Sequence, residues 1–269
     1  MSKPDVSVVM AAYNAERFID EALESLQTQT GTNFEILVVI DGWSNDNTAR
    51  IVEARAGTDE RVRPIHFDRH GLFPVLNAGI EAARSRLISF LDSDDLCPPD
   101  RVRRQVEKLS ADQSLGAVVG EVLIFESLEP DLTPTAGTRW ARVLGPCLGA
   151  GTFRRDAVES IGRFDESFTH SGDIDFLLRL NDSDWPIQPE ADLGLLCRKH
   201  GSNMSASAAD VQSNLLKALQ RSILRRRQSG RLNAPPPFAL MKPLSQIEGS
   251  ENGFPGHRTA DLFKQTRQP

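Results

Sequence analysis

The sequence predicts an α/β protein with a mostly parallel central sheet and helices on both faces. Four short apolar runs, at 6–11, 36–40, 62–67 and 87–91, alternate with segments whose apolar residues recur at helical spacing. The runs are rich in β-branched residues, as is typical of strands that are covered on both faces. Strands and helices that alternate in this way form right-handed βαβ units, so we expect these four strands to be parallel.

Three helices are predicted between these runs because apolar side chains recur there every three or four residues. Polar residues before two of them, Asn14 and either Ser44 or Asn45, are positioned to cap the first helical turn. The apolar faces comprise Phe18, Ile19, Ala22, Leu23 and Leu26 in the first helix, Ile51 and Val52 in the second, and Leu76, Ile80 and Ala83 in the third.

The second half of the chain has a less regular pattern. A helix through Val102, Val106 and Leu109 precedes a strand-like run at 117–125, and residues 126–139 have the composition of a loop. A long helix is expected over 207–229, and its arginine-rich end is expected to be solvated while the helix packs on the core rather than on an anionic membrane. Beyond residue 230 the Pro- and Gly-rich composition predicts an extended tail.

Composition excludes several classes of protein. A formal net charge of -6 argues against a partner made of nucleic acid, which normally requires a basic face. Cys97, Cys147 and Cys197 show no metal-type spacing, and an odd number of cysteines without a signal peptide indicates a reducing, cytoplasmic setting. No apolar segment approaches the roughly 18 residues that a spanning helix needs. We therefore expect a cytoplasmic protein whose association with membranes is at most peripheral.

The most informative segment is the apolar run at 87–91, which leads directly into Asp92, Asp94 and Asp95. Clustered carboxylates repel one another, and burying them without compensation is costly. A hard divalent cation such as Mg²⁺ or Mn²⁺ resolves this conflict because it prefers oxygen ligands. The structural alternative is an acidic turn in which Asp95 caps the next helix.

Polar residues follow three of the predicted strands directly: Tyr13, Asp41 and the acidic segment 92–95. In open parallel sheets, ligands bind beyond the carboxyl ends of the strands, so these residues are expected to share one site. The chain has neither a Gly-x-Gly-x-x-Gly motif nor a Walker-type loop, and a cation must therefore neutralise any bound phosphates. The pattern favours a site for a metal ion and a nucleotide.

Four segments, taken in order, resemble the inverting family-2 glycosyltransferases with the GT-A fold. The segments are 6–14, ending in Tyr-Asn; 34–42, ending in Asp-Gly; 77–95, with Asn-x-Gly-Ile and Asp-x-Asp; and 161–180, with Gly-Asp-Ile-Asp. The resemblance covers roughly residues 5–205. It implies a Rossmann-like sheet with a smaller acceptor-side subdomain. The implied division is a nucleotide-sugar-binding half at 1–110, an acceptor-side half at 111–205, and a C-terminal helix and tail at 206–269.

The resemblance also implies roles for individual residues. Asp173 matches the catalytic carboxylate that deprotonates the acceptor, while Asp94 and His200 match positions that ligate Mn²⁺ or Mg²⁺. The donor is implied to be a nucleotide-sugar, most often a UDP-sugar in this family, and the acceptor is an unidentified glycan, lipid, peptide or small molecule. Residues implied to contact the nucleotide are Ala11, Tyr13, Asp41, Arg69, Asp92 and Ser93.

The chain departs from the family pattern in two places. Gly172 stands where a Glu usually precedes the catalytic Asp. At the Asp41 loop, Ile40 stands where the family has the first Asp of Asp-Asp-Gly, and Trp43 is inserted after Asp41-Gly42. Trp43 is expected either to stack on the base or to cover the end of the strand. Asp175 is the alternative base, although its spacing from Arg179 also fits an i,i+4 ion pair.

Two other functions remain open from the sequence. A sugar-phosphate nucleotidyltransferase has a related sheet but normally carries a Gly-rich basic loop after the first strand, where this chain has Ala-Ala-Tyr-Asn. A nucleotide-binding scaffold with a degenerate transferase site is permitted by the two departures. Among the histidines, His70 flanks the presumed base pocket, and His66 is interpreted as a core histidine of the third strand.

Overall fold

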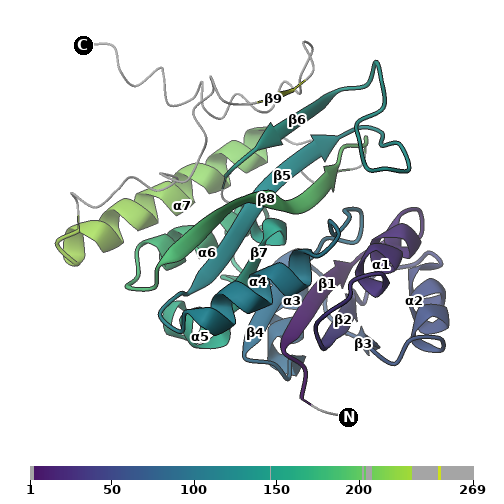
Figure 1. Ribbon diagram of the computed structural model, residues 1–269. Helices are drawn as coiled ribbons and strands as arrows, with labels where there is room; N and C mark the ends of the chain where they lie inside the picture. Colours follow the sequence, from purple (N-terminus) through teal and green to yellow (C-terminus); the bar gives the residue numbers. More distant parts are fainter. Residues whose placement is uncertain (1–2, 146, 202, 204–207, 232–247, 250–269) are drawn as a thin grey trace.

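The computed structural model describes residues 3–145, 147–201, 203, 208–231 and 248–249. These residues form one nine-stranded sheet in the order β3-β2-β1-β4-β7-β5-β6-β9, with β8 paired to β5 (Figure 1). The strands are β1 (Val6–Ala12), β2 (Phe34–Ile40), β3 (Val62–His66), β4 (Leu87–Phe90), β5 (Ala117–Phe125), β6 (Trp140–Val143), β7 (Gly151–Arg154), β8 (Ile187–Arg198) and β9 (Glu248–Gly249).

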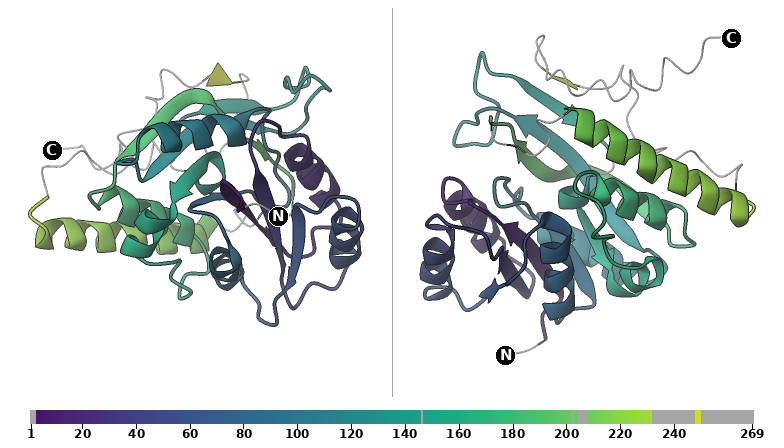
Figure 2. Two further views of the ribbon diagram at one scale, coloured as in Figure 1. Left: turned by 60° about the horizontal axis from the view of Figure 1, so that its bottom comes forward. Right: turned by 180° about the vertical axis from the view of Figure 1, so that it is seen from behind.

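The helices lie on both faces of this sheet, as the sequence predicts. In Figure 1, α4 lies in front of the sheet, whereas α3, α6 and α7 come forward in the view from behind (Figure 2). The helices are α1 (Ile19–Gln27), α2 (Thr48–Ala56), α3 (Leu72–Ala82), α4 (Arg101–Ala111), α5 (Arg155–Ile161), α6 (Gly172–Asn181) and α7 (Ala208–Gln228), with a 3₁₀ turn, η1 (Leu148–Ala150), before β7.

The first four strands are parallel, which confirms the predicted βαβ units. In the register of the sheet, Ala12 of β1 lies beside Ile40 of β2, and Val9 of β1 lies beside Phe90 of β4. His66 at the end of β3 pairs with Ile40 as well. The residues that follow all four strands therefore meet at one edge of the sheet.

The second half of the sheet is mixed. β7 is antiparallel to both β4 and β5, β6 is antiparallel to β5, and β8 is parallel to β5. Of these strands, only β5 follows from an apolar run in the sequence. The sheet is continuous through β4, β7 and β5, so both halves of the chain contribute to one core.

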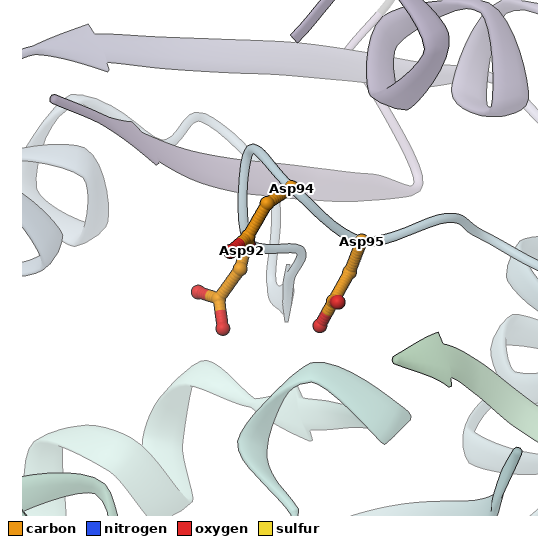
Figure 3. A group of neighbouring side chains, drawn as sticks. All are labelled: Asp92, Asp94 and Asp95. Carbon is orange, nitrogen blue, oxygen red and sulfur yellow. The ribbon is translucent and has the colours of Figure 1, made fainter. Parts of the chain in front are cut away.

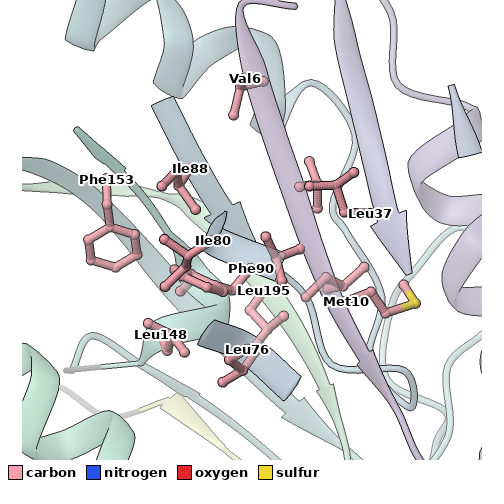
Figure 4. Packing of buried hydrophobic residues seen from close by; sticks show 14 of the residues in the cluster. Val6, Met10, Leu37, Leu76, Ile80, Ile88, Phe90, Leu148, Phe153 and Leu195 are labelled. Atoms are coloured by element: carbon pink, nitrogen blue, oxygen red, sulfur yellow. The ribbon is translucent and has the colours of Figure 1, made fainter. Parts of the chain in front are cut away.

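The core lies along β1, β2 and β4 and the helix α3 that packs on them (Figure 4). α3 approaches β1 closely because Gly79 has no side chain there. A Cβ built at Gly79 would lie only 2.3 Å from Cγ1 of Val9. This close approach sets the distance between α3 and the sheet.

The predicted helix caps are wrong. α1 begins at Ile19 and α2 at Thr48, and neither has Asn14 or Ser44 as its cap. Asn14 instead adopts a positive φ of 45° and accepts a hydrogen bond from the backbone N–H of Asn45 at 2.9 Å. These polar residues join the loops that follow β1 and β2, because short polar side chains tolerate left-handed backbone and bond nearby backbone groups.

The long helix α7 packs along α6, as Figures 1 and 2 show. Its arginine-rich end is not solvated as predicted, because Arg225 pairs with the buried Asp182 at 3.1 Å. Arg221 likewise pairs with Asp165 at 2.6 Å. In the part of the chain that the structure describes, no helix combines the length and apolar character needed to cross a bilayer. Apart from 248–249, the tail predicted beyond residue 231 lies outside the described residues.

Asp59, which lies just before β3, connects this edge of the sheet to α1. Its carboxylate accepts hydrogen bonds from Arg61 at 2.8 Å and from Gln27 of α1 at 3.0 Å. The hydrogen bond from the Arg61 side chain holds the pKa of Asp59 at about 2, below its ordinary 3.8. Because the folded-state pKa is depressed, the stabilisation is present above about pH 4 and is lost as the pH falls through about 2.

We expect Asp59→Asn to lower the free energy of unfolding by about 2 kcal/mol at pH 7, the equivalent of this pKa difference. The difference in the free energy of unfolding between wild type and variant should fall to about half by pH 3. Urea unfolding at both pH values measures it. A difference that does not change with pH would contradict the assignment.

Candidate active site

The acidic residues lie on a tight turn directly after β4. The turn is closed by a hydrogen bond from the Asp95 N–H to the Asp92 carbonyl, and Leu91 donates to Val9 of β1. Figure 3 shows the three aspartates leaving this turn, with the carboxyl groups of Asp92 and Asp95 pointing the same way. One oxygen from each of Asp92, Asp94 and Asp95 lies within 4.8 Å of the other two.

The protein environment disfavours so much negative charge. The Asp92 side chain reaches solvent, yet desolvation by the surrounding protein, together with the charges of Asp94 and Asp173, raises its pKa to about 7. Burial also raises the pKa of Asp95 well above its ordinary value. Lys199 partly offsets both shifts because it favours the charged carboxylates. The turn is therefore a place where a cation gains more than it would in water.

Asp95 does not cap the next helix, so that alternative is wrong: α4 begins six residues later, at Arg101. Its carboxylate instead accepts the backbone N–H of Arg198, at the end of β8, at 2.7 Å. The Arg198 guanidinium donates to the Asp94 carbonyl at 3.1 Å and to Glu21 of α1 at 2.6 Å. The end of β8 thus fixes the acidic turn.

The structure brings the two predicted metal ligands together. Nε2 of His200 lies 2.9 Å from Oδ2 of Asp94, and Nδ2 of Asn203 lies 3.2 Å from the same oxygen. The imidazole is mostly buried and packs on the ring of Phe18 at 4.5 Å. A carboxylate accompanied by an imidazole, with further carboxylates nearby, is a donor set that Mn²⁺ and Mg²⁺ accept. The residues present therefore fit a divalent cation.

Asp173 lies in the first turn of α6 and faces the acidic turn. Its charge is among those that raise the pKa of Asp92, although the two residues are far apart in sequence. Burial raises the pKa of Asp173 itself. Asp175 is buried and pairs with Arg179 at 2.8 Å, which confirms the i,i+4 ion pair considered for it. Asp175 therefore has a structural role in α6 through this ion pair.

Gly172, the departure from the usual Glu, has a physical explanation in the structure. A Cβ built at Gly172 would lie 2.6 Å from Cζ of Phe73 and within 2.9 Å of two further ring atoms. Phe73 is buried in α3 and stacks on Phe164 with ring centroids 5.8 Å apart. In this chain an aromatic ring fills the space that a side chain at 172 requires.

The corner after β1 and β2 holds the residues predicted for the nucleotide base. Ala11 lies near the end of β1, and Tyr13, which follows the strand directly, is half-exposed. The buried carboxylate of Asp41 accepts the backbone N–H groups of Trp43 and Gly71, both at 2.9 Å. Nδ1 of His70 lies 2.9 and 3.0 Å from its two oxygens.

Aromatic rings surround His70. The Trp43 ring stacks on the imidazole at 4.5 Å with an interplanar angle of 2°, and the Tyr13 ring lies tilted at 4.9 Å. The inserted Trp43 therefore covers a histidine rather than only the end of the strand. Arg69, predicted to contact the base, pairs with Glu166 at 2.5 Å. Ser93 lies half-buried within the acidic turn.

Sequence reasoning missed or misplaced several residues here. Arg198, Lys199 and Asn203 lie in the segment that contributed His200, and their proximity to it in sequence is the signal that could have found them. Cys147 also lies by the acidic residues, where burial and the negative charges raise its pKa to about 12. His66 is wrong as a core histidine, because β3 is an edge strand and its imidazole is 62% exposed.

The architecture of the sheet and the position of this site define the GT-A class of fold. S. aureus TarS 1–349 in complex with UDP-GlcNAc has a TM-score of 0.63 at 18% identity, covering 82% of this chain and 66% of that chain. The Pyrobaculum calidifontis mannosyltransferase PcManGT in complex with GDP-Man and Mn²⁺ has a TM-score of 0.60 at 19% identity, covering 83% and 65%. These likenesses support the fold.

The family follows from the sequence comparison. The family model for glycosyl transferase family 2 matches residues 7–144, and the chain belongs to this family. It is 48% identical over 100 residues to the putative glycosyltransferase EpsH of Bacillus subtilis (strain 168), covering 37% of this chain and 29% of EpsH. It is 28% identical over 233 residues to the chondroitin synthase of Escherichia coli, covering 82% and 33%. The chain thus spans about a third of the length of these curated relatives.

We expect Gly172→Ala to lower the free energy of unfolding by about 2 kcal/mol, because overpacking a filled core forces its neighbours to shift. Phe73→Leu should recover part of that loss in the double variant, which a urea-unfolding double-mutant cycle measures. Gly201→Ala is the matched control, since a Cβ there meets no atom within 4 Å. If the effects of Gly172→Ala and Phe73→Leu on the free energy of unfolding are additive, the Phe73 ring does not obstruct a side chain at position 172.

Proposed function

We propose that this chain is a metal-dependent inverting glycosyltransferase that transfers a sugar from a nucleotide-sugar, most often a UDP-sugar in this family, to an unidentified acceptor. The observation that supports the proposal is the proximity of two acidic groups from distant segments. Asp173 at the start of α6 is close enough to the acidic turn after β4 for its charge to raise the pKa of Asp92. The free cysteines fit a cytoplasmic setting.

On the donor side, the base lies at the corner formed by Ala11, Tyr13 and Asp41, and the ribose and diphosphate lie along the turn at 92–94. Arg69, which pairs with Glu166, is assigned to the nucleotide as well. A divalent cation, Mn²⁺ or Mg²⁺, would be held by Asp94 and His200, and when bound it supplies charge neutralisation for the departing diphosphate. The Mn²⁺ in the PcManGT complex supports this choice of ion for a related fold.

On the acceptor side, Asp173 acts as the general base. Its carboxylate takes the proton from the acceptor hydroxyl while the hydroxyl oxygen forms a bond to the anomeric carbon. The bond from that carbon to the diphosphate oxygen breaks on the opposite face, so the configuration inverts. The nucleoside diphosphate leaves with the electron pair.

Burial of Asp173 suits this role. A desolvated carboxylate binds a proton more tightly than one in water, and its raised pKa brings its basicity closer to what proton abstraction needs near neutral pH. Asp175 cannot replace it without breaking its pair with Arg179. One carboxylate of α6 is therefore available for chemistry, and the other secures the helix.

The first test concerns the cation. We expect UDP to bind wild type more tightly with Mn²⁺ than without it, and Asp94→Ala to lose this metal dependence. Titration calorimetry with and without Mn²⁺ measures both. Asp156→Asn, which changes an exposed aspartate in the first turn of α5, is the matched control and should behave as wild type. Unchanged metal-dependent binding by Asp94→Ala would remove Asp94 from the metal site.

The second test separates catalysis from binding. A thermal-shift screen of nucleotide-sugars with Mn²⁺ identifies the donor, and its slow hydrolysis to free sugar is then followed without an acceptor. We expect Asp173→Asn to bind the donor within about twofold of wild type but to react about 10²- to 10⁴-fold more slowly, the range for loss of a general base. Hydrolysis at the wild-type rate would exclude Asp173 as the base.

A further inference from the structure

At the corner after β1 and β2, the protein itself covers the Asp41 carboxylate and supplies donors to both of its oxygens. Its side chain is 3% exposed, and each oxygen already accepts one backbone N–H, from Trp43 and from Gly71. The His70 imidazole lies against both oxygens. Three protein donors therefore occupy this carboxylate, and His70 stands between it and solvent.

This arrangement fixes the tautomer of His70. An ionised carboxylate only accepts hydrogen bonds, so Nδ1 of His70 must carry the proton that it donates to Asp41. In the neutral imidazole, Nε2 is then a hydrogen-bond acceptor. The side chain is 37% exposed, so its ring is not sealed in the core.

The rings beside His70 offer flat apolar surface. Trp43 lies parallel to the imidazole, and both Trp43 and Tyr13 are at least half-exposed. Exposed aromatic rings offer faces on which nucleobases stack. An acceptor nitrogen between two aromatic rings is suited to the edge of a planar heterocycle.

We propose that His70, rather than Asp41, forms the hydrogen bond that selects the donor base, with Tyr13 and Trp43 forming the stacking surface around it. This inference rests on the proposed function, because it assumes that a nucleotide binds at this corner. Asp41 is a positioning residue that holds the proton on Nδ1 of His70. Trp43, which is absent from the family pattern, stacks on the imidazole and so holds the orientation of that ring.

The chemistry of Nε2 specifies a class of base. An acceptor nitrogen pairs with a ring N–H, which uracil and thymine carry at N3 and guanine carries at N1. Cytosine and adenine present an unprotonated ring nitrogen at the corresponding edge, so two acceptors would face each other. A site that leaves a polar group unpaired rejects such a ligand strongly. UDP, dTDP and GDP are therefore expected to bind more tightly than CDP and ADP.

The closest matched pair of probes is UDP and CDP, which differ only at this edge of the base. With Mn²⁺ present, we expect wild type to bind UDP at least about tenfold more tightly than CDP by titration calorimetry. His70→Phe keeps a flat ring between Tyr13 and Trp43 but has no acceptor. It should weaken UDP binding about tenfold and leave CDP binding unchanged, so the preference disappears.

Two further measurements distinguish base contact from a structural role. Asp41→Asn removes the charge that holds the proton on Nδ1, and the ratio of UDP to CDP affinity should fall. In wild type, the ¹⁵N signals of His70 should show a protonated Nδ1 and an unprotonated Nε2, independent of any variant. His66→Phe, at an exposed histidine of β3, is the matched control and should retain the wild-type ratio.

The outcomes separate this inference from the proposed function. If wild type binds neither nucleotide, the proposed function fails and this inference fails with it. If wild type binds UDP with metal dependence but His70→Phe keeps the preference for UDP over CDP, only the role of His70 is wrong. A wild-type preference for CDP over UDP, or a proton on Nε2 of His70, would also overturn the proposed role of His70.

Discussion

The site depends on the confinement of negative charge at the end of β4. Parallel pairing of β1 with β2 and β4 brings their carboxyl ends together, and the tight turn then places oxygens of Asp92, Asp94 and Asp95 within 4.8 Å of one another. The protein raises the pKa of Asp92 and Asp95 instead of stabilising their ionised forms. Such a cluster suits a cation, since clustered carboxylates are stabilised when they are paired or bind metals.

The end of β8 is the second requirement of the site, because it links the two halves of the chain. Arg198 donates its backbone N–H to Asp95 and its guanidinium to Glu21, and it lies over the ring of Phe18 at 5.1 Å. Lys199 and His200 follow directly and supply the positive and imidazole groups that the acidic turn needs. One strand end from the second half thus completes a site whose acids come from the first half.

The sequence is sufficient to predict the parallel half of the fold and the edge where the site lies, because continuous apolar runs ending in polar residues carry both signals. It is not sufficient for β7, whose residues Gly-Thr-Phe-Arg form no apolar run, or for β8, which contains Pro189 and Asp192. The packing of the loop that contains His70 depends on long-range backbone contacts, such as the hydrogen bond from Gly42 to the Arg69 carbonyl. No local pattern predicts such contacts.

Two departures from the family pattern, Gly172 and Trp43, are explained by aromatic packing. Phe73 occupies the space beside Gly172, and Trp43 stacks on His70. A site that is losing its function is expected to leave cavities or unpaired polar groups where its residues change, because nothing selects a compensating partner. Here each change is matched by a ring that fills the space or orders a neighbour. Gly172 and Trp43 therefore give no reason to regard the site as degenerate.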